Sequence, residues 1–184
     1  MIILDLDGVL ADFTTAACEV HGHPNYVSTR WGFYEDWGIT TDQFWDKIHA
    51  DGDRFYDCLV KPFWWMNDLL GLIERADDYV IMSSPSNDPA GYAAKKIWCD
   101  KYIDRPVKLI VGSEKHLLAG PDRLLIDDYD ENVRKFRAAG GYTLTFPQLW
   151  NGNSGAVDNR GGYVSDRLDN WKTYISTLHE GRVG

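Results

Sequence analysis

Two aspartates near the N-terminus have the residue type and the spacing that phosphoryl transfer requires. Asp5 and Asp7 lie at the end of an apolar run at residues 2–6, and Gly8 follows them. One carboxylate can attack phosphorus as a nucleophile, and its neighbour can protonate the leaving oxygen and then activate water. Both carboxylates would repel a phosphate dianion, so this chemistry requires a cation. For these residues alone, a pair of turn-forming aspartates is the alternative interpretation.

Further polar groups follow the later apolar runs. Ser83 and Ser84 end one run, where a hydroxyl and backbone N–H groups can hold phosphate oxygens. Lys115 comes after the next run. Asp127 and Asp128 end another, and adjacent carboxylates behind a buried strand are costly unless they are paired or bind a metal. Successive runs that each deliver such a group favour one shared site over coincidence.

Five short apolar runs predict the strands that must position these groups. Each run is continuous rather than alternating, as expected when both faces of a parallel sheet are covered. Helical patterns separate the later runs, which favours an α/β fold with its site at the carboxyl ends of the strands. The predicted strands are 2–6, 79–83, 107–111, 124–127 and 142–146. The helices between them are predicted from an Asp88 cap to about 103, over 115–118 after a Ser113 cap, and over 131–139.

Residues 7–78 separate the first two strands, which is far more than one crossover helix needs. Helical patterns at 10–21, 41–50 and 62–75 predict an inserted helical subdomain here, and a capping box from Thr40 to Gln43 opens the middle helix. Near the C-terminus, we expect a Gly- and Asn-rich loop at 151–162 and an amphipathic helix at about 166–180 that packs back on the domain.

Composition and charge restrict the class of protein. The 184 residues are 44% hydrophobic, which suits one globular domain with an insertion. The net charge of −9 argues against a nucleic-acid polymer as partner, whereas a metal ion and a few lysines suffice for a small phosphorylated substrate. Three scattered cysteines predict neither disulfides nor a zinc site. Without a membrane-length apolar run or a basic segment before the first strand, we expect a cytoplasmic protein with no membrane partner.

The order of these groups resembles that of the haloacid dehalogenase (HAD) superfamily of phosphohydrolases, across nearly the whole chain. The resemblance implies a Rossmann-like parallel sheet flanked by helices, with a core at 1–13 and 77–184. It also implies a small helical cap at 14–76, inserted after the first strand.

The same resemblance implies a role for each polar group. Asp5 would be the nucleophile and Asp7 the general acid and base. Ser83 and Lys115 would complete the catalytic set. The cofactor would be Mg²⁺, bound by Asp5, the backbone carbonyl of Asp7 and Asp128, with Asp127 in support.

A closer resemblance is to the 5′(3′)-deoxyribonucleotidases. It rests on DLDGVLADF at 5–13, SSP at 83–85, LLIDD at 124–128 and DNW at 169–171, the last being similar to that family's terminal helix. It implies hydrolysis of (deoxy)ribonucleoside monophosphates through an aspartyl-phosphate on Asp5, by a family whose members often act as homodimers. The substrate-binding residues would be Phe13, Ser84, an aromatic wall of Phe33 and Tyr34, and Lys96 as a second phosphate contact, with Lys95 as the competing choice.

Other functions remain open at this point. A phosphatase of this kind could act on a sugar phosphate or on the end-phosphate of a polynucleotide. A receiver-type signalling domain also gathers aspartates, a hydroxyl and a lysine at a parallel-sheet edge. Asp7 and the cap argue against a receiver, which lacks both, and the complete set of catalytic groups argues against a silent binding protein.

Overall fold

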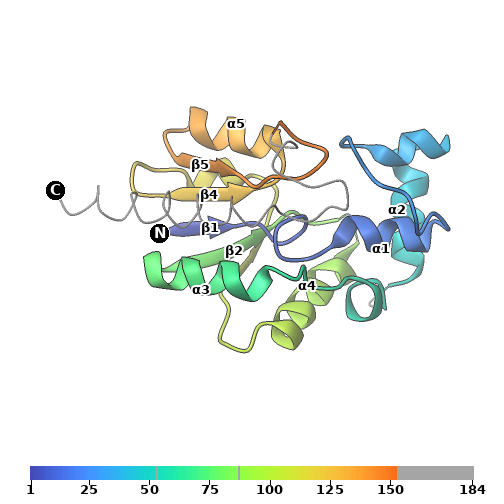
Figure 1. Ribbon diagram of the computed structural model, residues 1–184, viewed down its shortest axis with the longest axis horizontal. Helices are drawn as coiled ribbons and strands as arrows, with labels where there is room; N and C mark the ends of the chain where they lie inside the picture. Colours follow the sequence, from blue (N-terminus) through green and yellow to red (C-terminus); the bar gives the residue numbers. More distant parts are fainter. Residues whose placement is uncertain (53, 87, 153–184) are drawn as a thin grey trace.

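The computed structural model describes residues 1–52, 54–86 and 88–152, and its centre is a parallel sheet with helices on both sides (Figure 1). The strand order is β3-β2-β1-β4-β5, and every pairing is parallel. The α/β fold and all five predicted strands are confirmed, with β1, β3 and β5 shorter than expected. The strands are β1 (Ile2–Leu4), β2 (Tyr79–Ser83), β3 (Leu109–Val111), β4 (Leu124–Asp127) and β5 (Tyr142–Thr145).

Both faces of the sheet are buried, which explains why the strands are continuously apolar. On one face Leu4 and Ile126 belong to the main core, which also includes the buried side of α3 (Met66–Ala76) and of α4 (Pro89–Tyr102). On the other face Ile3 and Leu125 pack with Phe136 of α5 (Asp130–Ala138). Neighbouring residues of one strand point to opposite faces, so Ile3 and Leu4, or Leu125 and Ile126, contribute to different cores, whereas Ile110 of β3 and Tyr142 of β5 are exposed.

The helices of the sheet domain begin and end close to the predicted residues. α4 begins after Asp88, whose carboxylate accepts a hydrogen bond from the Ala90 N–H. The predicted helix at 115–118 is the short 3₁₀-helix η3 (Lys115–Leu118), but it begins after Glu114 rather than after a Ser113 cap. α5 ends before Gly140, which has a φ of +88°.

The inserted segment forms a separate group of helices beside the carboxyl ends of the strands (Figure 1). It contains α1 (Phe13–Val20), the 3₁₀-helix η1 (Phe33–Trp37), α2 (Thr41–Ala50) and the π-helix η2 (Phe55–Leu59). The capping box of α2 is confirmed, since Thr40 accepts from the Gln43 N–H and the Gln43 side chain accepts from the Thr40 N–H. α1 begins three residues later than predicted, because Asp12 accepts from the Thr15 N–H and caps it.

α3 lies along the sheet rather than with the inserted helices (Figure 1). The segment predicted as the cap, residues 14–76, therefore includes α3, which packs with the sheet domain. The predicted helix at 166–180, the segment 169–171 and all but the first two residues of the predicted loop at 151–162 lie outside the described residues. Within the described residues, no helix has the length and apolarity needed to cross a bilayer.

Candidate active site

Four strands bring polar side chains together at the carboxyl edge of the sheet. The ammonium of Lys115, which follows β3, lies 2.6 Å from Asp5 Oδ1 and 2.7 Å from Asp127 Oδ2. Lys115 is 1% exposed, and Asp127 is fully buried. Asp5 also accepts a hydrogen bond from the Leu6 N–H on Oδ1. The ion pair and hydrogen bond that the described residues make with the Asp5 side chain thus fall on Oδ1, and Oδ2 is the oxygen available to a ligand.

An acidic cluster stands beside this ion pair. One carboxylate oxygen each of Asp5, Asp127 and Asp128 lies within 4.8 Å of the others. The Oδ2 atom of Asp128 accepts a hydrogen bond of 2.8 Å from the Trp150 indole, but its buried Oδ1 atom has no hydrogen-bond partner among the described residues. A buried carboxylate oxygen without a donor is costly, and a cation would satisfy it.

The charges of the site also favour a bound cation. The carboxylates outnumber the lysine ammonium groups by two, so a divalent cation would balance them. The groups counted are Asp5, Asp7, Asp127 and Asp128 against Lys95 and Lys115. Carboxylate and carbonyl oxygens are the ligands that Mg²⁺ prefers, so the donor set fits this ion.

Burial and neighbouring carboxylates perturb the ionisation of the cluster. Burial raises the pKa of Asp5 to about 7 despite the opposing effect of Lys115. Burial, together with Asp5 and Asp127, also raises the pKa of Asp128 well above its ordinary range. Burial lowers the pKa of Lys115, but the two carboxylates beside it outweigh burial and keep that pKa above its usual value. Without a cation, full ionisation of all the carboxyl groups in the cluster is therefore unfavourable.

Gly8 permits the close approach of the chain to this cluster. Its φ is +78°, a conformation that favours glycine. A Cβ atom at this position would lie 2.2 Å from Asp128 Oδ2. The Gly8 carbonyl accepts a hydrogen bond from the buried Gln148 side chain. The sequence Asp-x-Asp-Gly thus needs its glycine to leave room for the second acidic pair.

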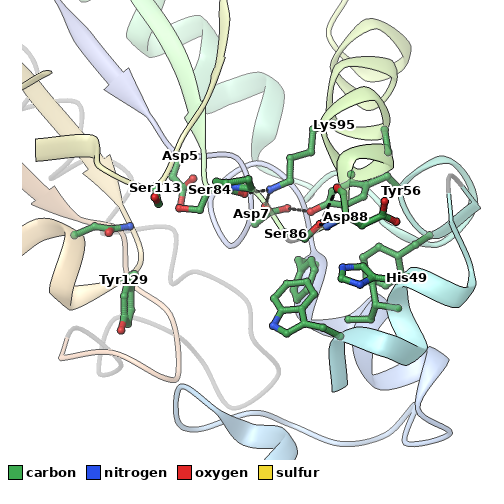
Figure 2. A pocket seen from close by; sticks show the side chains of 18 of the residues that line it. Asp5, Asp7, His49, Tyr56, Ser84, Ser86, Asp88, Lys95, Ser113 and Tyr129 are labelled. Atoms are coloured by element: carbon green, nitrogen blue, oxygen red, sulfur yellow. Dashed lines mark hydrogen bonds and ion pairs between the residues drawn. The ribbon is translucent and has the colours of Figure 1, made fainter. Parts of the chain in front are cut away.

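Asp7 occupies a separate network on the other side of Asp5. Its Oδ2 accepts hydrogen bonds from Lys95 at 2.7 Å and from Ser83 at 3.1 Å. Its Oδ1 accepts one of 3.0 Å from the hydroxyl of Tyr56, in η2 of the inserted segment. Lys95 also donates to Ser83 Oγ and to the Ser84 carbonyl, both at 2.6 Å. Figure 2 shows Lys95 reaching down from α4 to this group.

Asp127 serves as the support of the site. Its Oδ1 accepts from the Tyr129 N–H at 2.9 Å, and its Oδ2 accepts from the Asn132 amide at 3.0 Å in addition to Lys115. With these partners, Asp127 holds Lys115 against Asp5.

The site opens into a cavity of about 410 Å³ between the sheet edge and the inserted helices (Figure 2). Asp5, Asp7, Ser84 and Lys95 line it from the sheet side. From the inserted segment the lining is mostly apolar and comes from Phe13, Trp31, Trp45, Ile48, Phe55, Tyr56 and His49. Trp31 stacks on Tyr129, which follows β4, with ring centroids 4.4 Å apart. This contact joins the inserted segment to the sheet domain at the cavity.

The structure brings together most of the residues that the sequence proposed for the site. Asp5, Asp7, Ser83, Lys115, Asp127 and Asp128 meet at one sheet edge, and Phe13 and Ser84 line the cavity. Ser83 and Lys115 are buried behind the cavity and do not line it.

Lys96, Phe33 and Tyr34 do not lie where we expected them. Lys96 is half exposed, forms an ion pair with Asp100 one turn away on α4, and does not line the cavity. Its neighbour Lys95, the competing choice, lines the cavity instead. Phe33 is buried among aromatic side chains of the inserted segment, and Tyr34 stacks on Phe44, so neither forms the cavity wall.

The sequence contained a signal for Lys95 that the prediction did not use. Lys95 lies three and four residues before the buried Trp98 and Cys99, so it shares the buried face of α4. Tyr56, Gln148, Trp150 and Asn151 were missed altogether. The last three reach the site only through contacts far apart in sequence, which no local pattern reveals.

Comparison with known proteins supports the fold. No family model matches the chain. A haloacid dehalogenase-like hydrolase from Xanthomonas campestris is 14% identical, with coverage of 98% of this chain and 96% of that one and a TM-score of 0.57. A HAD family enzyme from Bacteroides thetaiotaomicron, in complex with magnesium and inorganic phosphate, is 17% identical over 84% of this chain and 96% of that one, with a TM-score of 0.46. The likeness to the Xanthomonas structure shows that the chain has the Rossmann-like α/β fold of the HAD hydrolases.

One curated protein is similar in sequence. It is the "Putative 5'(3')-deoxyribonucleotidase" of Vibrio phage KVP40, which is 24% identical over 141 residues. The match covers 72% of this chain and 68% of that protein.

Proposed function

We propose that this chain is a Mg²⁺-dependent phosphatase that hydrolyses (deoxy)ribonucleoside monophosphates through an aspartyl-phosphate on Asp5. The observation that carries the proposal is the arrangement around Asp5. Lys115 holds one carboxylate oxygen, the other is available at the cavity, and Asp128 presents an unpartnered buried oxygen in the same acidic cluster.

Mg²⁺ would be held by the carboxylates of Asp5 and Asp128 and by the backbone carbonyl of Asp7, with Asp127 in support. When bound, it supplies positive charge that offsets the repulsion between these carboxylates and a phosphate dianion. Lys115 adds a fixed positive charge beside Asp5 and keeps the nucleophile in one orientation.

In the first step, Asp5 Oδ2 attacks phosphorus while Asp7 gives a proton to the departing oxygen of the nucleoside. Both oxygens of Asp7 accept hydrogen bonds in the structure, Oδ1 from Tyr56 and Oδ2 from Lys95 and Ser83, so Oδ2 can carry this proton only after one donor turns away and the Ser83 hydroxyl rotates to accept. Lys95 is the donor suited to do so, because it lines the cavity and a phosphate oxygen would accept its hydrogen bond.

In the second step, Asp7 takes a proton from a water molecule, which attacks the phosphorus of the aspartyl-phosphate and releases Asp5 and inorganic phosphate. Burial and Asp7 raise the pKa of Tyr56 well above its ordinary value, so its hydroxyl keeps the proton that it donates to Asp7. The inserted helices cover this site and limit the access of bulk water to the intermediate.

Three features support a nucleoside monophosphate as the substrate. The cavity walls on the inserted side are aromatic, and flat bases stack on aromatic side chains. The net charge of −9 disfavours a polymer of phosphates. The similar phage protein carries a deoxyribonucleotidase name.

No specific feature favours the other functions. A sugar phosphate would leave the aromatic walls without a role. A signalling receiver needs neither Asp7 nor the inserted helices that hold it through Tyr56.

The direct test measures phosphate release from a panel of deoxyribo- and ribonucleoside monophosphates, sugar phosphates and 3′-phosphorylated oligonucleotides, with and without Mg²⁺. We expect Mg²⁺-dependent release from mononucleotides and a loss of at least about 10³-fold in kcat for Asp5→Asn, because the nucleophile is removed. Asp46→Asn, an exposed position on α2 that does not line the cavity, is the matched control. Wild-type rates in Asp5→Asn would refute the mechanism, and a preference for sugar phosphates or oligonucleotides would refute the substrate.

A further inference from the structure

The side of the cavity formed by the inserted helices offers few polar groups. Its lining there consists mainly of aromatic and aliphatic side chains, with Tyr56, His49 and the indole N–H groups of Trp31 and Trp45 as its polar side-chain groups. The Tyr56 hydroxyl is already used by Asp7. By contrast, the Nε2 atom of His49 is buried and has no hydrogen-bond partner among the described residues.

The position of His49 follows from the sequence of α2. Trp45, Ile48 and His49 are spaced at i, i+3 and i+4, so they share one face of the helix, and all three line the cavity. The imidazole stacks on the Trp45 ring, with centroids 5.8 Å apart. This stacking limits the orientation of the ring, and a buried imidazole nitrogen without a partner costs free energy that a ligand can recover.

His49 also lies on the side of the cavity where the leaving group must be. In Figure 2, Asp5 and His49 stand on different sides of the cavity, with Asp7 between them and Tyr56 on the same side as His49. A phosphoryl group in line with Asp5 directs its leaving oxygen toward Asp7, the proton donor. The organic part of the substrate then extends beyond Asp7, toward the rings of the inserted helices and His49.

We propose that His49 is a specificity-determining residue that hydrogen-bonds the polar edge of a flat heterocycle within the leaving group, the base of the departing nucleoside, while the neighbouring aromatic rings contact its faces. This inference rests on the proposed function and adds the residue that recognises the base. Ligand pockets commonly combine apolar walls with a few placed polar groups that fix orientation, and His49 is such a group here.

The test compares two substrates that differ at the edge of the ring. Phenyl phosphate carries a flat leaving group without polar edge atoms, whereas nucleoside monophosphates carry a base with donors and acceptors. His49→Phe keeps an aromatic ring but removes both nitrogens. We expect it to lower kcat/KM for the preferred nucleotide by about three- to tenfold, the loss typical of one neutral hydrogen bond, and to leave phenyl phosphate within about twofold.

Two further variants separate recognition from structure. His49→Gln places an amide nitrogen near the position of Nε2 and should recover part of the nucleotide activity. His23→Phe makes the same chemical change at an exposed position of the inserted segment that does not line the cavity, and it should leave both substrates unaffected. Thermal unfolding of each variant shows whether the fold is retained.

The outcomes distinguish the inference from the proposed function. If wild-type protein with Mg²⁺ releases phosphate from neither substrate, the proposed function fails, and the inference fails with it. If the wild type cleaves both and His49→Phe changes both alike, or changes neither, the function stands and the role of His49 is refuted. A selective loss on nucleotides that His49→Gln partly reverses supports the inference.

Discussion

Asp128→Asn should make the metal-free protein more stable and abolish its response to Mg²⁺. The substitution keeps the size of the side chain and an oxygen for the Trp150 indole. It removes a carboxylate that is buried beside Asp5 and Asp127 and has an unpartnered oxygen. Sites built to bind a charged ligand commonly lower the stability of the free protein in this way.

The raised pKa values give the sign of the effect, and the burial of the unpartnered Asp128 oxygen gives its size. At Asp5, a rise from 3.8 to about 7 corresponds to about 4 kcal/mol of unfavourable free energy at alkaline pH. Asp128 is as deeply buried, and its pKa is also raised well above its ordinary value. Because a buried polar oxygen without a partner costs about 1–3 kcal/mol, we expect Asp128→Asn to stabilise the metal-free protein by about 2 kcal/mol near pH 8, or about 4–8 °C in Tm for a chain of this size.

The pH dependence has a definite sign. A carboxyl whose pKa is higher in the folded than in the unfolded state binds more protons when folded, so it destabilises the protein increasingly as pH rises above about 4. The advantage of Asp128→Asn should therefore vanish near pH 4, where the carboxyl is largely protonated in the folded state and about half protonated in the unfolded state.

The assay is thermal unfolding with and without Mg²⁺ across this pH range. Mg²⁺ at about 100 times its dissociation constant should stabilise the wild type by about 3 kcal/mol and leave Asp128→Asn unchanged. Asp46→Asn is again the control for loss of a carboxylate at an exposed position. A variant that is less stable than the wild type without metal would contradict the cost assigned to the buried carboxylate, and one that retains the full response to Mg²⁺ would show that Asp128 is not a metal ligand.

The remaining predictions concern single contacts. Lys95→Met should lower kcat/KM by about 10²-fold, because it removes charge-assisted hydrogen bonds at Asp7 and the phosphate, whereas Lys96→Met on the exposed face of α4 should stay within about twofold. Steady-state kinetics of the pair would refute our placement of the phosphate contact if the two effects were equal. Trp150→Phe removes the N–H donor to Asp128 and should raise the Mg²⁺ concentration for half-maximal activity by about tenfold, with little change in kcat at saturating Mg²⁺. An unchanged Mg²⁺ requirement would contradict the role of the indole. Because the pKa of Asp5 is raised to about 7 and Mg²⁺ binds the ionised carboxylate, the Mg²⁺ requirement should be higher at about pH 6 than at about pH 8, and a Mg²⁺ titration that shows no difference would contradict this.

The sequence predicted the parts of the site that lie at the ends of strands. Each buried strand is a continuous apolar run, and the polar residue that ends it must lie at the carboxyl edge of a parallel sheet. This reasoning from the sequence places Asp5, Ser83 and Asp127 at the same edge. The structure agrees, since the register of β1 with β2 and β4 aligns the ends of these strands.

Residues on helices and in long loops were harder to place. On α4 a shift of one residue rotates the side chain by about 100°, so the choice between Lys95 and Lys96 decides whether the ammonium reaches Asp7 or solvent. Phe33 and Tyr34 fall in a short 3₁₀-helix whose orientation depends on packing against α2, which the local sequence does not specify.

The residues that contact Gly8 and Asp128 beside the acidic cluster come from a segment that carries no recognisable motif. Gln148, Trp150 and Asn151 follow β5 and reach the Gly8 carbonyl, the Asp128 carboxylate and the Asp128 carbonyl, respectively. These contacts join residues as much as 140 positions apart, so only the folded chain reveals them.

The most direct test of the central claim is to trap the phosphoryl group on the enzyme. Wild-type protein with Mg²⁺ and its nucleotide substrate is quenched during turnover, treated with borohydride to reduce any acyl phosphate, and mapped by peptide mass spectrometry. We predict that Asp5 alone is converted to homoserine, and only when both Mg²⁺ and substrate are present. Reduction at another aspartate, or steady turnover with no residue reduced, would contradict an aspartyl-phosphate on Asp5.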